Sequence, residues 1–282
     1  MPGDLILNEL GDFLKARRAE LDPARMGVIS DGHFRRVPGL RREEVAVLAG
    51  ISTEYYSRIE QGRIKASVPA LECVARALHL NEAQRAYMFH LAEIGRHAAS
   101  PADEYPQYVQ PQLQHMLDGL SSAAGFVIGR RTDLLAWNRM AALLVMDFSK
   151  IPAEQRNYVR LAFTEPLFKR LYRDWEAMAR LALAHLRMDS SRHPNDPRLT
   201  ALVQELSERD EQFRQWWASH DVAIRRGGTR PLRHPLVGDL ELIWSTYTCA
   251  DDTEQQLVVW TAEPGSATEE ALRVLALDAA ST

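Results

Sequence analysis

Apolar residues recur at three- and four-residue intervals along the first 95 positions of the chain. Leu10, Phe13 and Leu14 follow this spacing until Asp22 and Pro23, a pair that favours the end of a helix. The same spacing predicts further short helices over residues 41–49, 52–62, 69–78 and 82–94. This part of the chain is therefore predicted to be a small all-α domain.

Residues at the expected helix ends support these boundaries. Gly50 and Gly62 suit the left-handed conformation that often ends a helix. Ser52 can cap the helix that follows it by accepting a hydrogen bond from a free amide of the first turn. Asn81 with Gln84 three residues on has the pattern of a capping box.

The remainder of the chain has a different pattern. Small, polar and proline residues between Gly95 and Pro111 indicate a linker, and we expect domains at 1–97 and 98–282. Strand-like runs occur in AGFVIG, DLLAW, LELIWSTYT and QLVVWTA, and a long helical stretch lies between about 152 and 220. The spacing of the last two runs predicts an antiparallel pair. The second domain is thus expected to be α+β.

Composition and charge narrow the possibilities. The 282 residues are 46% hydrophobic, and no apolar run is long enough to cross a membrane, so we expect a cytoplasmic globular protein without membrane contact. Cys73 and Cys249 lie among apolar neighbours and are expected to be buried thiols. The net charge is −4, yet residues 15–65 hold 11 Lys and Arg against 7 Asp and Glu. Positive charge is therefore concentrated in the helical domain.

Residues 42–59 have the spacing of a helix-turn-helix. Counting Arg42 as the first position, Ala46 is fifth and small, Gly50 is ninth, and Ile51, Tyr56 and Ile59 are tenth, fifteenth and eighteenth. A small residue lets two helices cross closely, glycine permits a tight turn, and the later apolar residues face the core. An ordinary helix hairpin with a solvated polar face is the alternative.

The polar residues left on the third helix suit the major groove of DNA, because they can donate to and accept from base edges. Two roles are open for Glu54: its carboxylate accepts a hydrogen bond from a cytosine amino group, or it orients Arg58, four residues on, through an ion pair. The residues expected to contact bases are Thr53, Glu54, Ser57 and Arg58. Those expected to contact phosphates are Arg42, Ser52, Tyr55, Arg63 and Lys65.

The stretch LRREEVAVLAGISTEYYSRIEQGRIKASVPALECVARAL resembles the XRE family of phage-repressor-like helix-turn-helix regulators, over roughly residues 8–80. Phage repressors commonly have glutamines where this chain has Thr53 and Glu54, so the operator sequence does not carry over. The long basic loop before PGLRREEVA, the paired tyrosines, HPLVGDLELIW and LVVWTAEPGS are similar to the MmyB-like branch, over about 100–275. That resemblance implies a PAS-like sensor domain that accommodates a fatty-acid-like ligand.

Aromatic residues are abundant in the second domain, where all six tryptophans lie after residue 130. Such residues are more often core than pocket, but the resemblance raises the expectation that some line an apolar cavity. Arg130, Arg131 and His234 are the candidates for a carboxylate head group. The full set of candidate ligand-binding residues is Phe126, Arg130, Arg131, Trp137, Trp217, His234 and Trp244.

Sequence motifs of enzymes are missing from the chain: it has no HExxH, GxSxG, GxxxxGK[ST] or GxGxxG, and no CxxC pair. His185, His193, His220 and His234 have no metal-ligand spacing, so neither a metal nor a cofactor is expected, apart from the fatty-acid-like ligand. We expect a homodimer that binds double-stranded operator DNA and a small apolar ligand. The alternative is a regulator whose second domain binds a protein partner, and an enzyme with a DNA-binding appendage is a third reading without a supporting motif.

Overall fold

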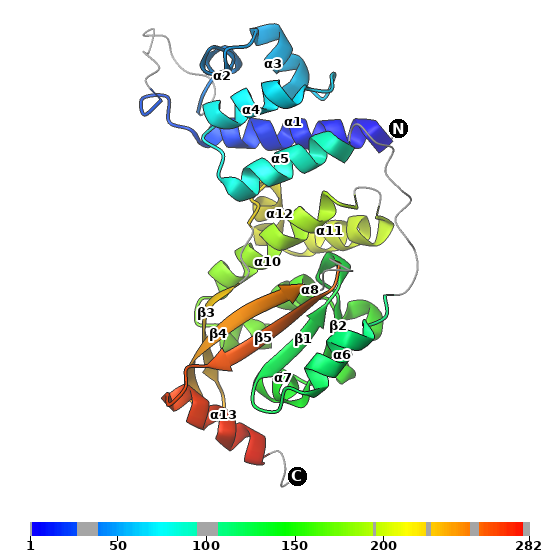
Figure 1. The fold of residues 1–282 in the computed structure, drawn as a ribbon, viewed down its shortest axis with the longest axis vertical. Helices are drawn as coiled ribbons and strands as arrows, with labels where there is room; N and C mark the ends of the chain where they lie inside the picture. Colours follow the sequence, from blue (N-terminus) through cyan, green and yellow to red (C-terminus); the bar gives the residue numbers. More distant parts are fainter. Residues whose placement is uncertain are drawn as a thin grey trace. The chain divides into compact units, whose positions relative to one another are not determined.

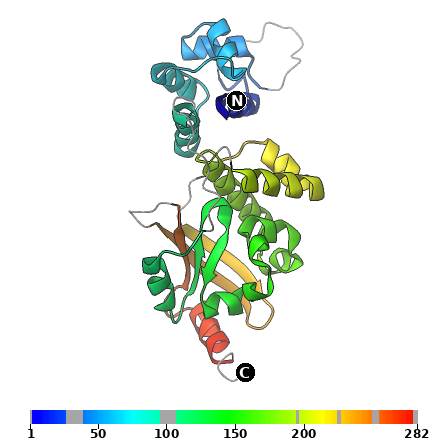
Figure 2. The same ribbon diagram turned by 90° about the vertical axis from the view of Figure 1, so that its right-hand side faces the viewer.

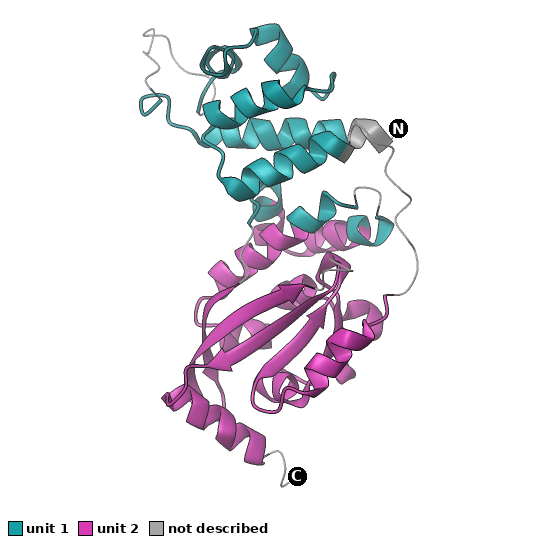
Figure 3. Cartoon of the chain, viewed as in Figure 1, with its two compact units in different colours: residues 1–103, 187–200, 215–223 teal, residues 104–186, 201–214, 224–282 magenta. Residues whose placement is uncertain are grey.

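The fold of this chain was obtained as a computed structural model, which describes residues 2–26, 39–94, 107–193, 196–223, 227–248 and 254–278. The chain forms two compact units (Figure 3). Unit 1 contains Met1–Asp103, Arg187–Thr200 and Gln215–Ala223, and unit 2 contains Glu104–Leu186, Ala201–Arg214 and Ile224–Thr282. The domain boundary expected near residue 97 lies outside the described residues.

The helices predicted for the first part of the chain are confirmed. They are α1 (Pro2–Glu20), α2 (Arg42–Ala49), α3 (Thr53–Glu60), α4 (Val68–Ala77) and α5 (Glu82–Ile94) (Figure 1). The predicted caps are also present: the Ser52 hydroxyl accepts a hydrogen bond from the Tyr55 amide at 3.1 Å. The Asn81 side chain accepts from the Gln84 amide, and the Gln84 side chain accepts from the Asn81 amide.

The core of unit 1 is formed by the inward faces of these helices. Phe13 from α1, Tyr56 from α3 and Tyr87 from α5 are fully buried, and the rings of Phe13 and Tyr87 meet edge to face. Leu71 and Val74 of α4, which are three residues apart, are also fully buried. Burial of an aromatic or aliphatic side chain contributes roughly 1.5–3 kcal/mol, so this shared core holds the short helices together.

Unit 2 contains a five-stranded antiparallel sheet with the strand order β2-β1-β5-β4-β3. The strands are β1 (Ala124–Ile128), β2 (Leu134–Trp137), β3 (Gly227–His234), β4 (Gly238–Thr248) and β5 (Gln256–Ala262). The helices that follow the linker are α6 (Pro111–Asp118), α7 (Arg139–Leu144), α8 (Tyr158–Thr164), α9 (Pro166–Leu171), α10 (Trp175–Ser190), α11 (Pro197–Arg209), α12 (Glu211–Ala218) and α13 (Ala267–Asp278). The predicted α+β fold and the antiparallel β4–β5 pair are confirmed.

The two faces of this sheet have different partners, and Figure 2 shows helices on both sides of it. On one face, Leu117 of α6 belongs to a buried cluster with Val127 and Leu257. The opposite face is aromatic, because directly paired residues share a face of the sheet: Phe126 pairs with Trp137, and Trp244 pairs with Trp260. Aromatic rings on this face contact Phe148, in the segment 148–150, and Tyr172, in the segment 158–172.

Some elements differ from the expectation. The four predicted strand runs are all strands, but β3, with the sequence GGTRPLRH, was not predicted. The long helical stretch is divided into the five helices α8 to α12. Cys73 is half-buried, and Cys249 lies outside the described residues.

Candidate DNA interface and ligand site

The turn between α2 and α3 has the geometry that the sequence spacing predicted. Gly50 has a φ of 67°, a left-handed conformation that glycine adopts without strain, and it ends α2. Ala46 and Ile59 are buried at the crossing of the two helices, and Tyr56 is fully buried. The turn therefore sets α3 with its apolar side inward and its polar side outward.

The outward side of α3 carries the residues expected to contact bases. Thr53, Glu54 and Arg58 are exposed, and Ser57 is half-buried. In the described part of the chain, Glu54 and Arg58 form no ion pair, so the guanidinium of Arg58 is not committed to its neighbour on the helix. Donors and acceptors on an exposed eight-residue helix are what direct reading of base edges needs.

The residues expected to contact phosphates have varied surroundings. Arg63 and Lys65 are exposed beyond the end of α3. The Tyr55 hydroxyl accepts a hydrogen bond from the Ser67 amide at 3.3 Å, and so ties the segment after α3 to the helix. Arg42, at the start of α2, is 39% exposed and already donates to Glu60 at 2.8 Å. The assignment of these residues to DNA stays a prediction.

A buried ion pair fixes α3 against α1. The guanidinium of Arg18 donates through Nε and Nη2 to both carboxylate oxygens of Glu60, at 2.8 and 2.9 Å. Burial raises the pKa of Glu60, but the hydrogen bonds and charge of Arg18 and then Arg42 outweigh that effect, so the pKa is lowered. Glu60 is the last residue of α3, and the pair therefore holds the end of this helix.

Three of the candidate ligand residues lie together on the aromatic face of the sheet. Phe126 contacts Phe148 and Trp260, with ring centroids 6.1 and 4.9 Å apart, and Trp137 contacts Phe148 at 5.3 Å. Trp244 lies on the same face, opposite Trp260 in the register of β4 and β5. The contact of Phe126, Trp137 and Trp244 with a ligand stays a prediction.

The candidate head-group residues have protein partners. Arg130 pairs with Glu254 at 3.4 Å, and Arg131 pairs with Asp133 at 2.9 Å. The Nδ1 atom of His234 accepts from the Leu236 amide, and its Nε2 atom lies 3.2 Å from the Leu143 carbonyl oxygen. Burial lowers the pKa of His234, which favours the neutral ring. A ligand carboxylate at either arginine would have to compete with a carboxylate of the chain.

Arg230 is a residue that the sequence-based reasoning missed. Its guanidinium carbon lies 5.1 Å from the ring centroid of Trp244, 5.3 Å from that of Trp260 and 5.7 Å from that of Tyr172. It donates to the Tyr158 hydroxyl at 2.8 Å, and this hydroxyl lies 3.0 Å from that of Tyr172. Burial lowers the pKa of Arg230, but Tyr158 and Tyr172 more than offset it, so the pKa is raised.

The charge of Arg230 has no carboxylate partner among the described residues, and the buried indole Nε1 of Trp260 has no hydrogen-bond partner there either. A desolvated cation without a counter-ion is costly, and contacts with aromatic faces recover roughly 2 kcal/mol of that cost. Arg230 is paired with Leu242, which lies two residues from Trp244 on β4 and so on the same face of the sheet. This register shows that the Arg230 side chain is on the aromatic face.

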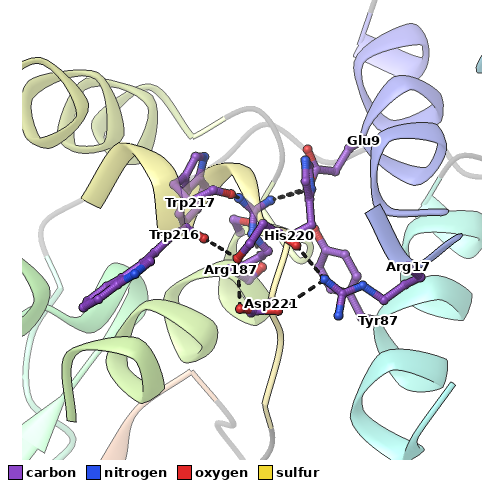
Figure 4. A network of polar contacts seen from close by, with 10 residues as sticks. Glu9, Arg17, Tyr87, Arg187, Trp216, Trp217, His220 and Asp221 are labelled. Atoms are coloured by element: carbon purple, nitrogen blue, oxygen red, sulfur yellow. Dashed lines mark hydrogen bonds and ion pairs between the residues drawn. The ribbon is translucent and has the colours of Figure 1, made fainter. Parts of the chain in front are cut away.

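Trp217, the remaining candidate ligand residue, lies in unit 1 and not on the aromatic face. The guanidinium carbon of Arg187 stacks 3.9 Å from the centroid of its ring. Arg187 also donates to Glu9 of α1 at 2.6 Å, and Tyr87 of α5 donates to the same carboxylate oxygen at 2.7 Å. Figure 4 shows this polar network, in which His220 also lies beside Glu9.

Over the described residues, no group of three or more His, Cys, Asp or Glu side chains could hold a metal ion. Likewise, none of the described helices combines the length and the apolar character that a membrane crossing needs.

The turn geometry and the exposed polar face of α3 define a helix-turn-helix protein, and a helix-turn-helix domain model matches residues 9–88. The model of the MmyB-like transcription regulator ligand binding domain matches residues 109–275, more than half of the chain. The chain belongs to this family of MmyB-like transcription regulators. Among curated proteins, none matches the chain.

Proposed function

We propose that the protein is a sequence-specific transcription regulator of the XRE type, whose C-terminal domain senses a small apolar, fatty-acid-like ligand. It acts as a homodimer in the cytoplasm, where two helix-turn-helix heads contact one palindromic operator. The protein acts by binding and catalyses no chemical reaction. Thr53 and Arg58, exposed on α3, support base reading, and the two exposed cations Arg63 and Lys65 support phosphate contact.

The observation that carries the ligand part is the surroundings of Arg230. A guanidinium among Tyr172, Trp244 and Trp260, without a carboxylate partner among the described residues, suits an anionic group attached to an apolar body. Arginine binds a carboxylate through two parallel N–H groups, and the aromatic side chains favour a hydrocarbon beside it. A fatty acid combines both chemical properties.

Chain length tests this proposal. Each buried methylene contributes about 0.8 kcal/mol, so tetradecanoate should bind more tightly than octanoate by roughly 5 kcal/mol if all of the added chain is buried. We expect thermal stabilisation to rise along the series from octanoate to tetradecanoate, below micelle formation, with a parallel change in tryptophan fluorescence. Equal or absent stabilisation across the series would mean that the aromatic residues are simply core and would favour a protein partner for this domain.

The role of Arg230 is tested by comparing tetradecanoate with its methyl ester. Arg230→Gln should remove the preference for the acid, because the ester cannot use the charge. Arg233→Gln is the matched control, since Arg233 is an exposed residue of the same strand and pairs with Asp239. An acid preference that survives in Arg230→Gln would place the head group elsewhere, with Arg130 and Arg131 as the next candidates.

A further inference from the structure

Unit 1 is built from separate stretches of the sequence. Besides α1 to α5, it includes Arg187–Thr200 and Gln215–Ala223 (Figure 3). Both of these stretches fall within residues 109–275, which match the ligand-binding family. Thus the helices of the DNA-binding head fold together with sequence that belongs to the ligand-binding family.

Arg187 is the centre of this shared unit. Its side chain is 3% exposed, and its Nη1 atom donates to Glu9 Oε1 at 2.6 Å. Its Nη2 atom donates to the carbonyl oxygen of Trp217, whose ring it also covers. The Tyr87 hydroxyl of α5 donates to the same Oε1 atom of Glu9. Arg187 is therefore linked to both α1 and α5 through one carboxylate oxygen. Figure 4 shows these side chains pointing toward one another.

A second contact of the same kind lies further along α1. The Nη2 atom of Arg17 donates to the Ser219 carbonyl oxygen at 2.5 Å and to Asp221 Oδ1 at 3.2 Å. Arg17 is 4% exposed. Two turns of α1 are therefore fixed by residues of the stretch 215–223 and by Arg187.

The backbone of α1 also lies close to the C-terminal end of α3. A Cβ atom on Gly11 would lie 2.3 Å from the Glu60 carbonyl oxygen, so the backbones of α1 and the end of α3 are in close approach. The Arg18–Glu60 ion pair fixes the same end of α3. Glu9 and Gly11 are two residues apart on one helix. A displacement of α1 at Glu9 therefore displaces α3, because tightly packed helices move together.

Arg187 is also continuous with the other unit through its own helix. α10 begins at Trp175, whose indole donates to the Ala162 carbonyl oxygen at 2.7 Å and whose ring meets Phe163. Residues of α10 up to Leu186 belong to unit 2, and Arg187 to Ser190 belong to unit 1. α10, Trp175–Ser190, is thus one helix of 16 residues with residues in both units.

We propose that Arg187 is a positioning residue for DNA recognition, which sets α3 through Glu9 and α1, and that ligand binding alters operator affinity through this contact. The second half of this statement rests on the proposed ligand function, whereas the first half does not. Arg187 does not itself touch DNA in this scheme. The polar network acts as a two-state element whose equilibrium both the ligand and the operator bias.

The test uses the full-length protein and an operator duplex selected by the wild type from random-sequence DNA. Arg187→Gln should lower the ratio of affinities for operator and scrambled duplex by about tenfold, the loss expected when one base contact is misaligned. Arg187→Lys, which keeps a cation for Glu9, should recover part of the ratio. Arg180→Gln on the same helix is the control, because Arg180 is exposed and pairs with Glu176, and it should leave the ratio within about twofold.

Two measurements distinguish a positioning role of Arg187 from a general effect on stability. The affinity ratio is measured well below the melting temperature of each variant, and hydrogen exchange is measured for the amides of α3. Amides of α3 should exchange faster in Arg187→Gln than in Arg180→Gln, although the hydrogen bonds of Arg187 go to Glu9, Trp217 and His220 and not to α3 in the described residues. Glu9→Gln serves as the second variant if Arg187→Gln does not fold, and it should shift both readouts in the same direction. An unchanged affinity ratio together with unchanged α3 exchange would overturn the positioning role.

The role of Arg187 in transmitting ligand binding is tested separately, by measuring operator affinity with and without tetradecanoate. We expect tetradecanoate to change the operator affinity of the wild type, and to stabilise Arg187→Gln thermally without changing its operator affinity. If Arg187→Gln keeps the full ligand effect, the transmission role is wrong. If tetradecanoate fails to bind the wild type, the proposed ligand function and the transmission role fail together, while the affinity ratio and hydrogen exchange still decide the positioning role.

Discussion

Replacing Glu60 by glutamine tests how much the buried ion pair contributes to the stability of the DNA-binding unit. The side chain of Glu60 is fully buried and receives hydrogen bonds from Arg18 and Arg42 at 2.8–2.9 Å. The substitution keeps the shape and one acceptor but leaves the buried Arg18 without its counter-ion. Removing one partner of a buried pair costs about 3–5 kcal/mol. Because Arg42 is 39% exposed and water can solvate it, we expect a value near the lower limit, ~3 kcal/mol.

Urea unfolding followed by circular dichroism at 222 nm measures this change; helices of both units contribute to the signal, so the transition that includes unit 1 is identified as the one that Glu60→Gln shifts. The control is Glu43→Gln, because Glu43 is exposed in the first turn of α2 and should change the free energy of unfolding by less than about 0.5 kcal/mol. A loss below about 1 kcal/mol for Glu60→Gln would refute the reasoning, because it would mean that the pair is compensated or well solvated.

The pH dependence of the same variant supplies a second check. The pKa of Glu60 is lowered in the folded state, so its stabilisation is present above its unfolded value of about 4.3 and is lost as the pH falls through the folded value. Wild-type stability should therefore fall below about pH 4.3 more steeply than that of Glu60→Gln. Parallel curves for the two proteins would show that this carboxylate does not titrate as the geometry requires.

Three more outcomes are expected. Burial raises the pKa of Glu9 but His220 and Arg187 lower it to about 2, so Glu9→Gln should flatten the loss of stability between pH 4.5 and 2 in acid titrations. Thr53→Ala with Arg58→Ala should abolish operator preference in mobility-shift titrations, at about 1–3 kcal/mol per lost contact, whereas Arg63→Ala should weaken all duplexes equally; an unchanged preference would contradict the base-reading role. Light scattering should show a dimer, both free and on an operator whose half-sites lie about 34 Å apart, and a monomer bound one-to-one would contradict this.

The helices of the DNA-binding head could be predicted because their signals are local. Ser52 and Asn81 cap helices, Gly50 permits the turn, and the apolar spacing identifies the buried side of each helix. Each of these signals depends on residues within about one turn of one another. The helix-turn-helix and its outward residues therefore follow from the sequence without any long-range information.

Strand β3 and Arg230 could not be predicted in this way. The sequence GGTRPLRH contains two glycines and a proline, which disfavour a strand, and it is a strand because it pairs with β4 at the edge of the sheet. Only the register of that pairing shows that Arg230 faces the aromatic side. Arg130 was a candidate for the ligand head group, but its partner Glu254 is more than 120 residues away in sequence, so no local pattern indicates this ion pair.

Unit 1 also has a consequence for the order in which the protein is made. Glu9 and Arg187 are 178 residues apart, and at a synthesis rate of about 5–20 residues per second roughly 10–35 s separate their appearance. During that interval the nascent helix-turn-helix lacks the guanidinium that joins α1 to α5. A chain cut short before residue 187 leaves Glu9 and Tyr87 without this partner, so messages truncated in the ligand-binding region yield an incomplete DNA-binding unit.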